Sequence, residues 1–196
     1  MQNAPDAPHA NALQRFIDEA LAASRAHAEP SDAVLAIAPP MMQLCARAGD
    51  FLRPAHRRSD PAHYTRNLVH NAPDNSLSLY AIAWLPGQWT PVHDHGSWGV
   101  VGVVEGVLEE RSYVRLTPDD DRDDRIRLAR GGVVLLPTGA VSTFVPNPDH
   151  IHVTGVAPDR PPVISLHLYG RTMSNFNIYD AAAGSRRRIE VAHNES

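Results

Sequence analysis

The sequence contains a single cysteine, Cys45, among 196 residues. One cysteine cannot form an intramolecular disulfide, and chains without disulfides are typical of reducing compartments. No apolar run approaches the roughly 18 residues that a membrane-spanning helix needs. The first residues, MQNAPDAPHANALQRF, lack the basic segment followed by an apolar segment that marks a secretory signal. We therefore expect a cytoplasmic protein without a membrane partner.

The sequence also lacks an excess of positive charge, since 18 Lys and Arg stand against 22 Asp and Glu. Proteins that bind nucleic acid carry a basic surface, so no nucleic-acid partner is expected. The one basic run, 186–188, is interpreted as a solvated segment. The acidic run 119–124 lacks the glycine and final glutamate of a calcium-binding loop, so it too is interpreted as solvated. We expect a monomer.

Aromatic residues make up only 6% of the chain, whereas 17 prolines favour many short strands over long helices. A chain of this length is most simply one domain. We divide it into a helical region (1–60), a barrel (61–180) and a C-terminal segment (181–196). Apolar spacing and breaker residues predict helices that begin at Asn11, at residue 31 or 32, and at Met41, ending before Pro30, before Pro39 and at Ala48.

Past residue 60 the pattern changes to short apolar and β-branched runs separated by turn residues. This spacing indicates a β-sandwich or a small barrel of the jelly-roll kind. The strands are predicted at 64–69, 77–84, 100–104, 107–116, 126–128, 133–136, 151–156 and 163–169.

His93 and His95 are separated by one residue in a strand-like stretch, so their side chains share a face. Imidazoles bind iron, copper, zinc or nickel, and the pair predicts half of a metal site. Such a site needs at least one more ligand, either a carboxylate or a third histidine. The two residues alone leave that choice open, and they also leave open that no metal binds.

This stretch resembles the first motif of the cupin superfamily, G-x5-H-x-H-x3,4-E-x6-G. Gly87, His93, His95 and Gly106 match the motif, but Gly99 stands at the place of its metal-binding glutamate. The resemblance therefore implies the cupin jelly-roll barrel, also called the double-stranded β-helix, without that carboxylate ligand.

The second cupin motif, G-x5-P-x-G-x2-H, matches at Gly131, Pro137 and Gly139, but Ser142 replaces its histidine. A general cupin interpretation thus loses two metal ligands. The thiol dioxygenase branch of the cupins, represented by the cysteine dioxygenase type I family, resolves the discrepancy. Its members bind ferrous iron through three histidines and no carboxylate.

From about residue 64 to 180 the chain resembles that family, including its Ser-x-His-x-Tyr signature at Ser165, His167 and Tyr169. The family's third histidine lies thirteen residues before the signature, which is where His152 stands. His150 is the alternative ligand, because residues i and i+2 of a strand share a face.

The resemblance implies that Fe²⁺ binds to His93, His95 and His152. It also implies a catalytic relay in which Ser165 orients His167, and His167 orients Tyr169 toward metal-bound substrate and dioxygen. From the residues alone, the same three side chains could form the polar outer face of a sheet, although the alternating Leu166 and Leu168 favour a strand of a closed barrel with both faces occupied.

Arg66 stands two residues after Tyr64, a context in which mammalian-type cysteine dioxygenases use an arginine to hold the substrate carboxylate. A guanidinium pairs with a carboxylate through two parallel hydrogen bonds. In relatives that act on 3-mercaptopropionate, a glutamine usually takes this place. Tyr64 and Trp84 are expected to line the same pocket.

The resemblance thus implies oxidation of L-cysteine by O₂ to cysteine sulfinic acid. 3-Mercaptopropionate or another small thiol remains an alternative substrate, and a non-catalytic cupin that binds a small ligand remains an alternative function. Mammalian members carry, at the place of Gly99, a cysteine that crosslinks to the tyrosine matching Tyr169. Glycine has no thiol, and Cys45 lies in a predicted helix, so no Cys–Tyr crosslink is expected.

Overall fold

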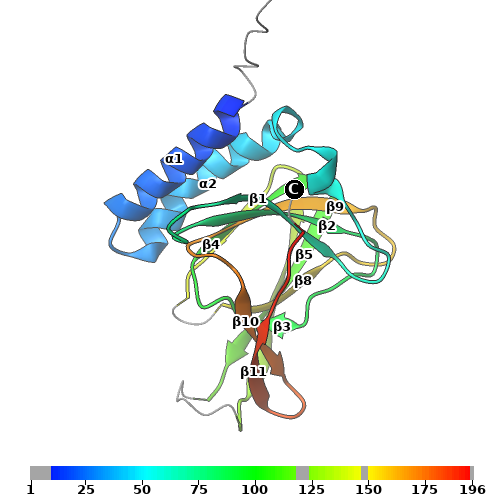
Figure 1. The fold of residues 1–196 in the computed structure, drawn as a ribbon. Helices are drawn as coiled ribbons and strands as arrows, with labels where there is room; N and C mark the ends of the chain where they lie inside the picture. The colour runs from blue at the N-terminus through cyan, green and yellow to red at the C-terminus, as the bar shows by residue number, and fades with distance from the viewer. Residues whose placement is uncertain (1–9, 118–123, 147–149, 195–196) are drawn as a thin grey trace, which may run out of the picture.

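The computed structural model describes residues 10–117, 124–146 and 150–194, and shows two helices packed against a β-barrel (Figure 1). All but Asp124 of the acidic run 119–124 lies outside the described residues. No helix in the described part of the chain is long and apolar enough to cross a membrane.

Two antiparallel sheets form the barrel, with strand orders β1-β2-β9-β4-β7 and β11-β10-β3-β8-β5-β6. This mainly β architecture with N-terminal helices confirms the predicted fold class. The strands are β1 (Thr65–Asn71), β2 (Ser78–Trp84), β3 (Val92–His93), β4 (Gly99–Glu105), β5 (Val107–Arg115), β6 (Leu128–Pro137), β7 (Val141–Phe144), β8 (Ile151–Gly155), β9 (Val163–Tyr169), β10 (Asn175–Asp180) and β11 (Ser185–Glu190).

The helices α1 (Ala10–Ala26) and α2 (Pro30–Ala46) cover the outer face of the five-stranded sheet (Figure 1). Two short 3₁₀ helices, η1 (Ala48–Asp50) and η2 (Pro54–Arg57), lead from α2 to β1. The prediction of a break at Pro39 was wrong, because α2 continues through both prolines.

The prolines remove the N–H groups that would bond the carbonyls of Leu35 and Ala36. Both residues are exposed, so water can satisfy these carbonyls. On the opposite side of α2, Ile37 and Met41 are fully buried against the sheet. Tertiary packing of this apolar face therefore outweighs the local breaking tendency of the two prolines.

The predicted strand at 133–136 is part of a longer strand, β6, which begins at Leu128 and so includes only the last residue of the strand predicted at 126–128. The glycines between them are not a turn. A Cβ on Gly131 would lie 2.5 Å from Ser112 Oγ, so glycine permits close approach of β5 at a register shift. The strands β7, β10 and β11 were not predicted, and β11 contains the basic run 186–188, of which Arg187 and Arg188 are exposed.

The central strands β2 and β9 have one face under the helices and the other inside the barrel. Leu166 and Leu168 of β9 belong to the core beneath the helices. Ser165, His167 and Tyr169 alternate with them and are buried on the opposite face, inside the barrel. The alternative of a polar outer face is therefore wrong for this strand.

Candidate metal centre

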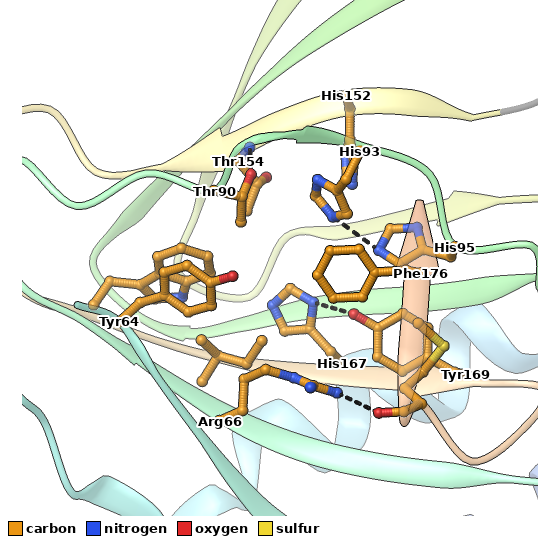
Figure 2. Close-up of a pocket in the computed structure, with 13 residues that line it drawn as sticks. Tyr64, Arg66, Thr90, His93, His95, His152, Thr154, His167, Tyr169 and Phe176 are labelled. Atoms are coloured by element: carbon orange, nitrogen blue, oxygen red, sulfur yellow. Dashed lines mark hydrogen bonds between the residues drawn. The ribbon is translucent and has the colours of Figure 1, made fainter. Parts of the chain in front are cut away.

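Three histidines meet inside the barrel because β3 and β8 are neighbours. His93 lies directly opposite His152 in this antiparallel pair. His95 follows two residues after His93, and all three side chains are buried. One ligand nitrogen from each lies within 4.8 Å of the others. Figure 2 shows the imidazoles of His93 and His95 pointing toward one another across the cavity.

One ring nitrogen from each of the three histidines faces a common centre. His93 Nδ1 donates to the carbonyl oxygen of Pro91 at 3.1 Å, so its Nε2 carries a lone pair. This Nε2 lies 3.1 Å from His95 Nε2. His152 Nε2 is buried without a hydrogen-bond partner. Such a set fits a divalent transition metal.

Electrostatics keep the three imidazoles in the form that binds metal. Burial lowers the pKa of His93 and of His95 well below 6.5, and neighbouring histidines lower both further. Burial also lowers the pKa of His152, against the opposing effect of Glu110. The rings are therefore neutral at neutral pH, and no proton has to leave before a metal binds.

Among the described residues, the three-histidine group includes no carboxylate. Asp94 stands between two of the ligands, but its carboxylate accepts hydrogen bonds from Asn177 and from Tyr179 on the other side of the strand. Glu110 contacts the outer side of His152 instead. A metal here would have three neutral protein ligands.

Phe144 occupies the space of the missing cupin glutamate. A Cβ on Gly99 would lie 2.2 Å from Cζ of Phe144, so the ring can sit there only because residue 99 is glycine. The Phe144 ring stacks on His95, with centroids 4.6 Å apart and planes inclined by 22°. No sequence pattern indicated this contact, since Phe144 lies on the unpredicted strand β7.

The signature residues form a hydrogen-bonded chain that begins at Trp84. The indole N–H donates to Ser165 Oγ at 2.9 Å, Ser165 Oγ lies 2.8 Å from His167 Nε2, and His167 Nδ1 lies 3.4 Å from Tyr169 Oη. Because an indole nitrogen only donates, Ser165 Oγ accepts from Trp84 and keeps its own O–H and a second lone pair for the contact with His167 Nε2. His167 therefore connects Ser165 and Tyr169 through its two ring nitrogens.

Burial holds this chain neutral. It lowers the pKa of His167 from 6.5 to about 3 and raises the pKa of Tyr169. The raised pKa keeps Tyr169 a protonated phenol at the wall of the cavity. Tyr169 also lies beside the metal ligands, with its ring centroid 5.1 Å from that of His95.

All nine residues predicted from the sequence lie at one cavity: eight line it, and the ninth, Ser165, supports His167 from behind. Tyr64 stacks on Trp84 with centroids 4.7 Å apart. The sequence did not predict Ile82, Thr90, Thr154, Met173 or Phe176. The lining residues are Tyr64, Arg66, Ile82, Trp84, Thr90, His93, His95, His152, Thr154, His167, Tyr169, Met173 and Phe176 (Figure 2).

The Arg66 guanidinium is held at the wall of this cavity. Its Nη2 donates to the carbonyl of Met173 at 2.9 Å, and its Nη1 to the carbonyl of Ala192 at 3.4 Å (Figure 2 shows the first bond). The guanidinium also lies over the Tyr80 ring, 4.6 Å from its centroid. The longer bond is weak, so Nη1 can exchange it for a better acceptor.

Comparison with known proteins places the chain in a family. The sequence profile described as cysteine dioxygenase type I matches residues 51–182, which includes every residue of the site. The chain belongs to the cysteine dioxygenase type I family. It is therefore a thiol dioxygenase of the cupin type, which confirms the resemblance seen in the sequence, and the members of this family depend on a metal.

Solved structures also match. TT1209 from Thermus thermophilus is 18% identical, with 62% of this chain and 97% of that chain covered and a TM-score of 0.43. A Klebsiella pneumoniae protein with a double-stranded β-helix domain is 17% identical, with 67% and 93% covered and a TM-score of 0.45. A cupin 2 domain-containing protein from Halorhodospira halophila is 17% identical, with 64% and 77% covered and a TM-score of 0.40.

Proposed function

We propose that the protein is an iron-dependent dioxygenase that converts L-cysteine and O₂ into cysteine sulfinic acid. Both oxygen atoms are added to the substrate sulfur. The observation that carries the proposal is the Arg66 guanidinium on the wall of the cavity that contains the three histidines. A carboxylate and a thiol on one small molecule match a cation and a metal site in one small cavity.

His93, His95 and His152 would hold Fe²⁺. When bound, iron supplies a Lewis acid for the thiolate and the redox chemistry of dioxygen. Three neutral ligands leave the double positive charge uncompensated, which favours an anionic sulfur ligand. Nitrogen donors of this kind suit iron, and the absence of a carboxylate leaves room for substrate and O₂.

Arg66 would fix the orientation of the substrate. Its Nη1 would give up the long bond to Ala192 and bind the carboxylate, while Nη2 stays anchored to Met173. Charge-assisted bonds of this kind are about twice as strong as neutral ones. Because the carboxylate end of the substrate is held, the sulfur atom is kept in a fixed position for its reaction with oxygen.

Tyr169 would donate its phenolic proton to the bound substrate or oxygen. In this proposal Ser165 O–H donates to His167 Nε2 and His167 Nδ1–H donates to Tyr169 Oη, so the chain that begins at Trp84 directs the phenolic proton into the cavity. Burial raises the pKa of Tyr169, so the phenol stays protonated while it donates. Tyr169 thus acts as an oriented hydrogen-bond donor, and its proton stays on Oη.

Metal analysis of the purified protein and oxygen uptake with a panel of thiols test the proposal. We expect bound iron, one O₂ consumed per sulfinate formed, and a higher kcat/KM for cysteine than for 3-mercaptopropionate. A clear preference for 3-mercaptopropionate would contradict the cysteine assignment and leave the thiol dioxygenase class intact. A protein without metal and without thiol-dependent oxygen uptake would instead be a ligand-binding cupin.

A further inference from the structure

A second cluster of ligand-type side chains lies behind His152, outside the cavity. Glu110 of β5 points to the same side as His152 of the neighbouring strand β8. Its Oε1 lies 3.6 Å from His152 Nδ1 and 3.0 Å from His150 Nε2. Glu110 is buried, with 8% of its surface exposed, so its charge acts in a medium of low polarity.

The position of Glu110 decides which nitrogen of His152 is available to a metal. A carboxylate facing Nδ1 favours the tautomer that carries its proton on Nδ1. The lone pair is then on Nε2. Both nitrogens are buried without a hydrogen-bond partner, and only Nδ1 has a carboxylate oxygen beside it, at 3.6 Å. When Nε2 coordinates a cation, the Nδ1 proton becomes more acidic, and its attraction to the carboxylate increases.

His150 supports two of the three metal ligands by different contacts. Its Nε2 donates to Glu110, which in turn faces His152. Its ring stacks on Phe144 with centroids 4.8 Å apart and planes inclined by only 6°. Phe144 stacks on His95. The residue that competed with His152 as third ligand thus lies behind the site.

We propose that Glu110 and His150 are positioning residues that orient the His152 imidazole for metal binding. Glu110 sets the tautomer and the ring orientation, and His150 holds the Glu110 carboxylate in place. This inference rests on the metal site of the proposed function. It extends that site to a carboxylate and a fourth histidine that never touch the metal.

Fe²⁺ affinity, measured under anaerobic conditions by competition with a chromogenic chelator, tests the inference. Carboxylates that orient metal-binding histidines contribute about 10–100-fold to metal affinity, and we expect a loss of this size in Glu110→Ala. Glu110→Gln keeps an acceptor oxygen and should lose less. His150→Phe keeps the ring stack but not the donor, and should show a smaller loss than Glu110→Ala.

Glu109→Gln is the matched control. Glu109 precedes Glu110 on β5 and is equally buried, with 8% of its surface exposed. Its carboxylate pairs with Arg111 at 2.8 Å and with Arg160, away from the histidines. We expect this variant to bind Fe²⁺ as the wild type does.

The visible d–d spectrum of the Co²⁺-loaded protein separates positioning from a general structural role. Reorientation of one imidazole should change this spectrum in Glu110→Ala, while the unfolding temperature of the metal-free Glu110→Gln variant stays near that of the wild type. An unchanged spectrum and unchanged affinity would overturn the inference. Two tightly bound metal ions per chain would also overturn it, since Glu110 would then be a ligand. If the wild type itself binds no Fe²⁺, the proposed function fails instead.

Discussion

At the scale of single residues, Gly99 determines the ligand set of the site. The sequence showed that residue 99 supplies no glutamate to the metal. The structure adds that the space is filled, because the Phe144 ring lies where a side chain on residue 99 would begin. Sequence motifs report which donor is missing. They cannot report which distant residue packs into the space, since that depends on the pairing of β4 with β7.

Gly99→Ala should destabilise the protein. The added Cβ would lie 2.2 Å from Phe144 Cζ, and the ring is held between His95 and His150. Overpacking of this kind costs about 1–3 kcal/mol, measured as the free energy of urea unfolding. The double variant Gly99→Ala/Phe144→Leu should recover part of the loss. An unfolding free energy equal to the wild type in Gly99→Ala would show that the ring moves freely.

Arg66→Met should impair selectively the substrates that carry a carboxylate. The lost charge-assisted hydrogen bonds are worth about 1.5–3 kcal/mol, or about 10–100-fold in kcat/KM for cysteine. Cysteamine is a thiol without a carboxylate, and its kcat/KM should stay near the wild-type value. Equal losses for both thiols would mean that Arg66 acts through the fold, by its bonds to Met173 and Ala192, rather than on the substrate.

At the scale of elements, the sequence predicted strands well where alternation and turn residues agree. The parity of Ser165, His167 and Tyr169 correctly placed them on one face of β9. The strand β10 was missed because its sequence, NFNIYD, is rich in asparagine and is stabilised by pairing with β3 and β11. Pairing between distant strands also places His152 opposite His93, and no local pattern contains that register.

The segment 191–194, which follows β11, lies along β1 and positions Arg66. Asn194 N donates to the Arg66 carbonyl at 2.7 Å, Leu68 N donates to the Asn194 carbonyl at 2.9 Å, and Ala192 accepts from the guanidinium. These contacts come from the main chain. The segment therefore helps to fix the guanidinium at the cavity wall whatever side chains it carries.

Removal of residues 191–196 should raise the KM for cysteine several-fold without reducing Fe²⁺ affinity. The deletion removes the main-chain bonds that hold β1 at Arg66 and Leu68, and a guanidinium displaced by their loss should bind the carboxylate more weakly by about the worth of one hydrogen bond, about 1 kcal/mol or fivefold. The matched variant Asn194→Ala loses only the side-chain bond to Asn67 and should behave as the wild type. Loss of Fe²⁺ binding in the shortened chain would show that the segment supports the whole barrel rather than Arg66.

At the scale of the whole molecule, stability and function are divided between the two faces of one sheet. The face under α1 and α2 packs apolar side chains such as Leu79, Leu166 and Leu168. The inner face contributes His167 of β9 to a polar site inside the barrel, which the other sheet completes with His93 of β3 and His152 of β8. Burial lowers the pKa values of these three histidines and of His95. Burial of neutral imidazoles makes the folded state sensitive to acid.

His167 allows this sensitivity to be measured, because it belongs to the hydrogen-bonded chain and not to the metal ligands. Its pKa falls from 6.5 in the unfolded chain to about 3 in the folded protein. Below pH 6.5, His167 is therefore protonated in the unfolded chain but stays neutral in the folded protein, and the free energy of unfolding decreases as the pH falls. The loss from this residue is about 1.4 kcal/mol per pH unit between roughly pH 6 and pH 3.

Urea unfolding of metal-free wild type and His167→Gln at several pH values between 7.5 and 4.5 tests this reasoning. The variant should be less stable at pH 7.5, since glutamine cannot reproduce the bonds to Ser165 and Tyr169. Below about pH 6 the wild type should lose stability faster than the variant, by about 1.4 kcal/mol per pH unit. The other histidines titrate in both proteins, so the difference isolates His167. Parallel pH profiles would show that the folded barrel accepts a proton on His167, and a charged His167 could no longer accept from Ser165 while donating to Tyr169.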